Sequence, residues 1–225
     1  MVGGISIGPA RKVYRSRPNG EIEQVHIVGT LGLVVKDELE GSTFMLSNWH
    51  VLFADNVCGP GDVIIQPSPV DTSERNRVGT NIRGRRNSKV DCAIARNYHD
   101  RDASINEIAD DPGQEYIFTD PGEPPVDFVW KRGRTIKKTA GFISATDASV
   151  IIDGDRFIDQ ILIISDRNSR FADKGDSGSV IVMNQTLSTK LLIVGLLFGS
   201  EDDGEWAVAN KILTVFRQLG VRPVN

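Results

Sequence analysis

The chain has 225 residues and a formal net charge of −4, and 40% of its residues are hydrophobic. A chain of this length and composition buries enough apolar surface for a stable globular core. Its pI of about 5.4 argues against nucleic acid as a partner. No apolar run approaches the ~20 residues of a membrane span, and the first residues lack the basic-then-apolar pattern of a secretion signal. We therefore expect a cytoplasmic protein that does not bind membranes.

The chain contains two cysteines, Cys58 and Cys92. A domain of this size does not need a disulfide, and the spacing of the two residues matches no pattern of metal ligands. We therefore expect unpaired thiols, with Cys92 packed as a small apolar residue, and neither a metal nor a cofactor.

The first half of the chain has the pattern of strands separated by polar turns. Residues 1–24 predict one short strand followed by a surface arm. Residues 25–36 and 43–47 are rich in β-formers on either side of a polar turn, which predicts a hairpin. Residues 48–53 follow directly, where a strand is expected to end and a short helical turn to begin.

His50 lies in this predicted turn and is the first candidate for a general base. A histidine beside apolar residues is often only structural, so the assignment depends on partners elsewhere in the chain. His26 and His99 are weaker candidates, because His26 lies in the middle of a strand and His99 in a polar segment.

Residues 58–89 are rich in turn formers around a short strand at 63–65, and the basic run from Arg83 to Lys89 is expected to be a solvated loop. Asp91 follows within the otherwise apolar segment 90–95. A carboxylate in such a strand is costly to bury unless another group pairs with it, which makes Asp91 the candidate to orient a histidine.

The second half begins after an acidic, proline-containing connection over residues 101–125. Apolar residues then recur at helical spacing at the end of the chain, which predicts a terminal helix. Two sets of strands and one helix predict paired β-barrels, the first over residues 25–110 and the second over residues 111–225. The predicted strands of the second barrel lie at 126–131, 135–145, 150–152, 158–164, 180–182, 191–199 and 206–209.

The turn Gly175-Asp176-Ser177-Gly178 lies between a polar loop and an apolar strand. Glycine, aspartate and serine also form ordinary turns, so the motif alone does not establish catalysis. A serine hydroxyl becomes an effective nucleophile only with a base that accepts its proton and donors that hold the oxyanion. Here the backbone amides of Gly175 and Ser177 are the candidate donors.

Three motifs, Asn-x-His-Val at 48–51, Asp-Cys-Ala-Ile-Ala at 91–95 and Gly-Asp-Ser-Gly at 175–178, occur in this order. Together they resemble the chymotrypsin-like (trypsin-like) serine proteases of the bacterial type, from residue 29 to the end of the chain. The order His, Asp, Ser differs from that of α/β-hydrolases, whose G-x-S-x-G motif is interrupted here by Ser179. The resemblance implies two six-stranded antiparallel β-barrels, a C-terminal helix and cleavage of protein or peptide substrates.

The resemblance also implies the role of each residue in the triad. Ser177 attacks the carbonyl, His50 accepts its proton, and Asp91 holds the imidazole in the required tautomer. Asp176 is expected to brace the oxyanion loop by hydrogen bonds, the alternative being an ion pair with a freed chain terminus.

The substrate pocket implied by the resemblance has Phe171 at its base and a wall of Phe198, Gly199 and Ser200. Because the base carries no carboxylate, a small or apolar residue is expected before the cleaved bond. Asp173 and the acidic residues 201–203 favour a basic residue instead if they reach the pocket.

Two other functions compete with a protease. One is a catalytically silent member of the same fold that binds a peptide or a partner protein. The other is nucleic-acid binding through two basic groups, which the acidic pI disfavours. The two basic groups comprise Arg83, Arg85 and Arg86, and Lys131, Arg132 and Arg134.

The sequence does not predict the oligomeric state.

Overall fold

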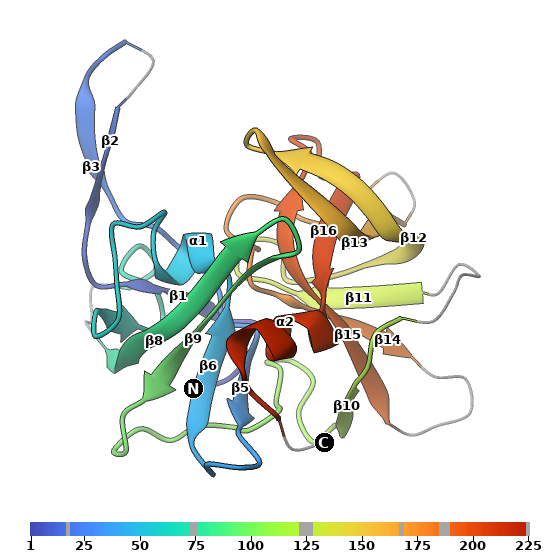
Figure 1. Cartoon of the computed structure of the whole chain (residues 1–225), viewed down its shortest axis with the longest axis horizontal. Helices are drawn as coiled ribbons and strands as arrows, with labels where there is room; N and C mark the ends of the chain where they lie inside the picture. Colours follow the sequence, from blue (N-terminus) through green and yellow to red (C-terminus); the bar gives the residue numbers. More distant parts are fainter. Residues whose placement is uncertain (17–18, 73–75, 122–127, 167–168, 185–189, 224–225) are drawn as a thin grey trace.

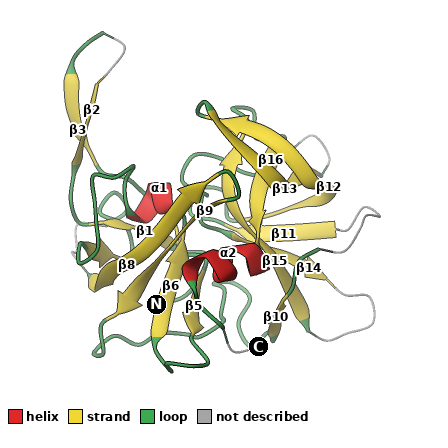
Figure 2. Cartoon of the chain, in the orientation of Figure 1, coloured by secondary structure: helices red, strands yellow, loops and turns green. Residues whose placement is uncertain are grey.

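The computed structural model describes residues 1–16, 19–72, 76–121, 128–166, 169–184 and 190–223, which form two β-barrels and two helices (Figures 1 and 2). Parts of the predicted connection 101–125 and of the predicted strand 126–131 lie outside these residues. The expected all-β fold with a C-terminal helix is confirmed. Among the described residues, no helix is long and apolar enough to cross a bilayer.

The first barrel is a seven-stranded sheet whose two end strands belong to one extended segment. β4 pairs with β1, and β5 pairs with β6. Only residues 31 and 32 separate β4 from β5, so this segment joins the two ends of the sheet. When β4 and β5 are counted as one strand, the first barrel has six strands. The order along the sheet is β4 (Gly29–Thr30), β1 (Ser6–Pro9), β7 (Val63–Ile65), β8 (Arg77–Asn87), β9 (Val90–Asn97), β6 (Thr43–Ser47) and β5 (Leu33–Lys36).

The second barrel is closed by an additional pairing between β15 and β16, which makes a ring of six antiparallel strands from β11 to β16. β10 adds to the outside of β15 in a parallel orientation. The order along the sheet is β10 (Tyr116–Phe118), β15 (Leu191–Ser200), β14 (Val180–Asn184), β11 (Phe128–Arg132), β12 (Lys138–Ile152), β13 (Asp155–Ser165) and β16 (Trp206–Lys211).

The terminal helix α2 (Ile212–Leu219) packs against the largest hydrophobic core, which combines residues of both barrels. Its buried face carries Ile212, Val215, Phe216 and Leu219, the four residues whose spacing predicted the helix. Gly220 ends the helix with a left-handed φ of 60°. Cys92 is buried in the same core, as predicted, and both cysteines are free.

Most of the basic run from Arg83 to Lys89 does not form the expected loop. Arg83, Arg85 and Arg86 lie in β8, an eleven-residue strand that pairs along its length with β9, whereas Lys89 lies in the turn between the two strands. Arg83 and Arg85 are exposed, as expected of a solvated segment, but pairing with β9 makes the segment a strand. Arg86 is partly buried on the other face, where its long side chain lies over the rings of Trp49 and Phe157.

The N-terminal region has a short strand followed by a projecting arm, the order predicted for residues 1–24. β1 is part of the first barrel, so only the segment after it projects from the body, as β2 (Val13–Ser16) and β3 (Ile22–Val25) (Figure 1). These two strands form a separate two-stranded sheet. The boundary between the barrels near residue 110 stays a prediction.

Candidate active site

His50 lies on the short helix α1 (Trp49–Leu52), directly after β6, where the sequence predicted a helical turn. The carboxylate of Asp91, on β9, accepts hydrogen bonds from the amides that begin this helix. Its Oδ1 accepts from Trp49 N at 2.7 Å and from His50 N at 3.2 Å. Asn48 Nδ2 also donates to the carbonyl of Asp91 at 2.7 Å. The position of α1 is thereby fixed to β9.

The same carboxylate holds the imidazole of His50. Asp91 Oδ2 lies 2.9 Å from His50 Nδ1, and the Asp91 side chain is only 3% exposed. Since a carboxylate accepts at this nitrogen, Nδ1 carries the proton and Nε2 of the neutral ring is left as the acceptor. This is the arrangement required of a histidine that takes a proton from a nucleophile.

Two polar residues of the second barrel, Asn210 and Gln160, form a hydrogen-bonded chain to the backbone of Asp91. Asn210 Oδ1 accepts a hydrogen bond from Asp91 N at 2.9 Å, and Asn210 Nδ2 donates to Gln160 Oε1 at 2.6 Å. Both side chains are buried. Sequence reasoning missed these two residues. The available signal was a polar residue directly beside an apolar stretch, Gln160 before residues 161–164 and Asn210 after residues 206–209.

The pKa of His50 is raised above its ordinary value. Burial opposes the charged form, but attraction to Asp91, their hydrogen bond and the nearby carboxylate of Asp55 outweigh it. The cation of Arg86 acts in the opposite direction and lowers this pKa. Arg86 forms ion pairs with Asp55 at 3.2 Å and with Asp155 at 2.9 Å.

The Ser177 turn has a backbone that only glycine tolerates on both sides of the serine. Gly175 and Gly178 have φ values of 100° and 98°, and a Cβ on Gly178 would lie 2.1 Å from the carbonyl oxygen of Thr30. Thr30 N donates to the carbonyl of Ser177 at 2.7 Å. The turn is therefore anchored to the first barrel.

Two amides of this turn are left without an acceptor. Asp176 N donates to the carbonyl of Asp173 at 2.9 Å, whereas within the described chain the amides of Gly175 and Ser177 donate to no group. These are the two donors predicted for an oxyanion hole.

The turn is braced from inside by a buried ion pair. Asp176 Oδ2 lies 2.7 Å from Lys131 Nζ, and both side chains are fully buried. Asp176 Oδ1 also accepts from Thr135 N at 2.7 Å. Burial lowers the pKa of Lys131, and Asp176 opposes this shift. Bracing by Asp176 is thus confirmed, and it needs no chain terminus because Lys131 on β11 supplies the cation, which sequence reasoning missed.

His50, Asp91 and Ser177 line one cavity of about 590 Å³. In the described structure Ser177 Oγ makes no hydrogen bond to His50, and such contacts commonly tighten only when a substrate binds. Phe198, Gly199 and Ser200 line the same cavity, and Ile152 lies against Gly199, 3.3 Å from the place of a Cβ there.

The structure does not bring Phe171 into this cavity. Its side chain is fully buried in the core of the second barrel, where it packs close to Gly141. The prediction counted back from the serine along the chain, but the loop places its large apolar side chain in the core, where burial is favourable. Asp173 and Asp202 do line the cavity, together with Arg15, Asp55, Arg86, Asp153, Phe157 and Lys174.

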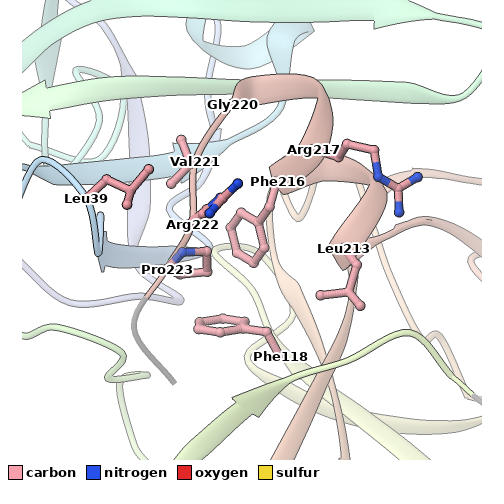
Figure 3. Close-up of a pocket in the computed structure, with 9 residues that line it drawn as sticks. All are labelled: Leu39, Phe118, Leu213, Phe216, Arg217, Gly220, Val221, Arg222 and Pro223. Carbon is pink, nitrogen blue, oxygen red and sulfur yellow. The ribbon is translucent and has the colours of Figure 1, made fainter.

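A second cavity of about 620 Å³ lies between α2, β10 and the chain end (Figure 3). Leu39, Phe118 and Phe216 give it an apolar lining, and two arginines border it. None of the described residues that line it is a nucleophile or a base. No group of three or more potential metal ligands occurs in the described residues. The triad cavity is therefore the candidate active site.

The chain has the fold of the chymotrypsin-like serine proteases of bacteria, as predicted. A glutamic acid-specific serine protease that uses a histidine triad in substrate binding is similar over 100% of both chains, with a TM-score of 0.68 and 14% identity. The Nocardiopsis protease matches over 100% of this chain and 98% of its own, with a TM-score of 0.65 and 15% identity. Cellulomonas bogoriensis chymotrypsin matches over 99% and 97%, with a TM-score of 0.63 and 17% identity. No family model and no curated protein matches the sequence.

Proposed function

We propose that this protein is a serine endopeptidase that hydrolyses peptide bonds through an acyl-enzyme. The observation that carries the proposal is the hydrogen bond of 2.9 Å between His50 Nδ1 and Asp91 Oδ2 in the cavity that Ser177 also lines. An orienting carboxylate, a neutral imidazole, a serine, and two unpaired amides in the turn that presents this serine are the parts that acyl transfer requires.

In the proposed reaction, Ser177 Oγ attacks the peptide carbonyl while His50 Nε2 accepts the hydroxyl proton. The amides of Gly175 and Ser177 donate to the oxyanion, which strengthens their hydrogen bonds as charge develops. His50 then gives the proton to the leaving amine. In the second half of the reaction His50 accepts a proton from a water molecule, which attacks the acyl-enzyme and releases Ser177. Asp91 stays ionised and stabilises the imidazolium.

A peptide library analysed by mass spectrometry tests this proposal. We expect new chain ends after incubation with the protein and none with the Ser177→Ala variant. An unchanged library, or equal cleavage by both proteins, would contradict the proposal.

The residue before the cleaved bond is expected to be small or apolar. The wall at Gly199 is bordered by Ile152, while Asp173 is engaged by Arg170 at 2.6 Å. Asp202 is 99% exposed, and an exposed carboxylate contributes little to binding a cation. The glutamic acid-specific structural neighbour uses a histidine triad in substrate binding, whereas His50 is the one histidine among the described residues lining this cavity.

The same library decides this preference. Cleavage chiefly after leucine, phenylalanine or alanine supports an apolar pocket. Cleavage chiefly after arginine or lysine would overturn it and assign Asp173 or Asp202 to substrate binding.

The rate of hydrolysis is expected to rise with pH through the ionisation of His50, because only the neutral imidazole accepts a proton. Since the pKa of His50 is raised, the midpoint of kcat/KM should lie above about 6.5. Asp55→Asn should move the midpoint to lower pH, and Arg86→Gln should move it to higher pH. Measured profiles that do not move, or that move in the reverse directions, would exclude His50 as the titrating base.

A catalytically silent protein of the same fold remains the second candidate, and it predicts peptide binding without turnover. The candidate nucleic-acid function has less support. Lys131 and Arg132 are buried in ion pairs, and Arg134 binds Asp71 at 2.7 Å. These cations are engaged within the protein.

A further inference from the structure

The arm of β2 and β3 projects from the body on the side of α1, the helix that carries His50 (Figure 1). Within the described chain no third strand joins the arm, and an isolated two-stranded sheet is marginally stable in water. Its base is fixed by Val13, which is buried against Ala54 and Cys58 in the loop that follows α1. The base of the arm thus packs against the loop that follows the helix of His50.

The pairing of the two strands defines which side chains face the body. Val13 lies opposite Val25, and Arg15 lies opposite Glu23. Because alternate residues of a strand share one face, Arg15 projects on the same face as Val13. That face is turned toward the body, and Arg15 lines the cavity that contains His50 and Ser177. Tyr14, on the opposite face, is 71% exposed.

The arm rests on the side of the cavity that carries His50, because Val13 packs against the loop after α1. In the proposed reaction, the acyl part of a substrate is expected to face the wall formed by residues 198–200. The leaving amine must contact His50, which protonates it, and the arm rests on the loop after this residue. In the proposed reaction, residues that follow the cleaved bond are therefore expected to extend toward Arg15, which lines the same cavity.

Arg15 has a charge that the surrounding protein leaves available. Its side chain is exposed, and it forms no ion pair in the part of the chain that the structure describes, although Glu23 lies across the arm. Asp55, the carboxylate on the nearby loop, is paired with Arg86.

We propose that the β2–β3 arm binds the segment of a polypeptide substrate that follows the cleaved bond, and that Arg15 selects an acidic side chain there. The proposal rests on the proposed function for the direction of the substrate. It adds a specificity-determining residue outside the triad and outside the wall at residues 198–200.

The test uses internally quenched peptides with one acyl sequence and with aspartate, asparagine or lysine at each of the first four positions after the bond. We expect kcat/KM to be two- to fivefold higher for aspartate than for asparagine at one position, roughly the range of an exposed ion pair. Arg15→Ala should remove this preference, and Arg15→Glu should reverse it in favour of lysine. Lys12→Glu, an equal change of charge at an exposed site outside the cavity lining, should leave it intact.

Two further measurements separate this proposal from the proposed function. An ester that has no residue after the scissile bond should be hydrolysed equally by the wild type and the Arg15 variants. Peptides of the same sequences that carry a fluorophore and no quencher are titrated with the Ser177→Ala protein, and fluorescence anisotropy gives the charge preference of binding without turnover. An aspartate-to-lysine affinity ratio that Arg15→Glu leaves unchanged would overturn the role of Arg15, whether or not the wild type hydrolyses the ester.

Discussion

Replacing Ser177 with alanine is expected to lower peptide hydrolysis by about 10³-fold or more, because the attacking oxygen is lost. His50→Ala should cause a loss of similar size, since members of a triad act as a unit. The double variant should therefore be about as impaired as either single variant. Initial rates on one cleaved peptide, measured at a pH where wild-type activity is maximal, give these values.

Matched controls show whether such losses are local. Ser144 is an exposed serine on β12, and His99 is an exposed histidine. Ser144→Ala and His99→Ala should retain wild-type rates. Circular dichroism should show that Ser177→Ala and His50→Ala are folded. Near-wild-type hydrolysis by a folded Ser177→Ala protein would contradict the assignment of the nucleophile.

Lys131→Met is expected to destabilise the protein by about 3–5 kcal/mol, because it leaves the buried carboxylate of Asp176 without its cation. The methionine side chain has similar length, so loss of the charge dominates the effect. Activity should also fall, since Asp176 holds the turn that presents the amides of Gly175 and Ser177. The free energy of unfolding is measured with urea, and the activity with the same peptide.

Lys138 provides a matched control for Lys131. It forms an ion pair with Asp111 at 3.4 Å, but its side chain is 48% exposed. An exposed pair contributes about 0–1 kcal/mol, so Lys138→Met should have a small effect on stability. Equal effects of the two substitutions would mean that the buried pair does not brace the Ser177 turn.

The residues of the candidate triad could be predicted because each departs from its local pattern. Asp91 is a carboxylate in an apolar strand, and Ser177 lies between glycines that the backbone requires. Lys131 departs in a similar way, directly after the apolar residues 128–130 of β11, and the rule applied to Asp91 would have made it a candidate buried cation.

Other features depend on contacts between distant segments and were not predictable from one sequence. Asn210 and Gln160 support Asp91 across the two barrels. Phe171 lies in a core whose shape is set by several strands. The segment with Arg83, Arg85 and Arg86 has the composition of a loop, yet pairing with β9 makes it part of β8. Strand order and core packing decided these outcomes, whereas local patterns decided the triad.

Labelling with a fluorophosphonate probe tests the central claim most directly, because this reagent reacts with a serine only where a base and an oxyanion hole activate it. The wild-type protein should become covalently labelled, with mass spectrometry locating the adduct on Ser177. Ser177→Ala should not be labelled, and His50→Ala should be labelled far more slowly. A folded wild-type protein that is not labelled, or that is labelled equally after Ser177→Ala, would contradict an active serine hydrolase and favour the silent binding protein.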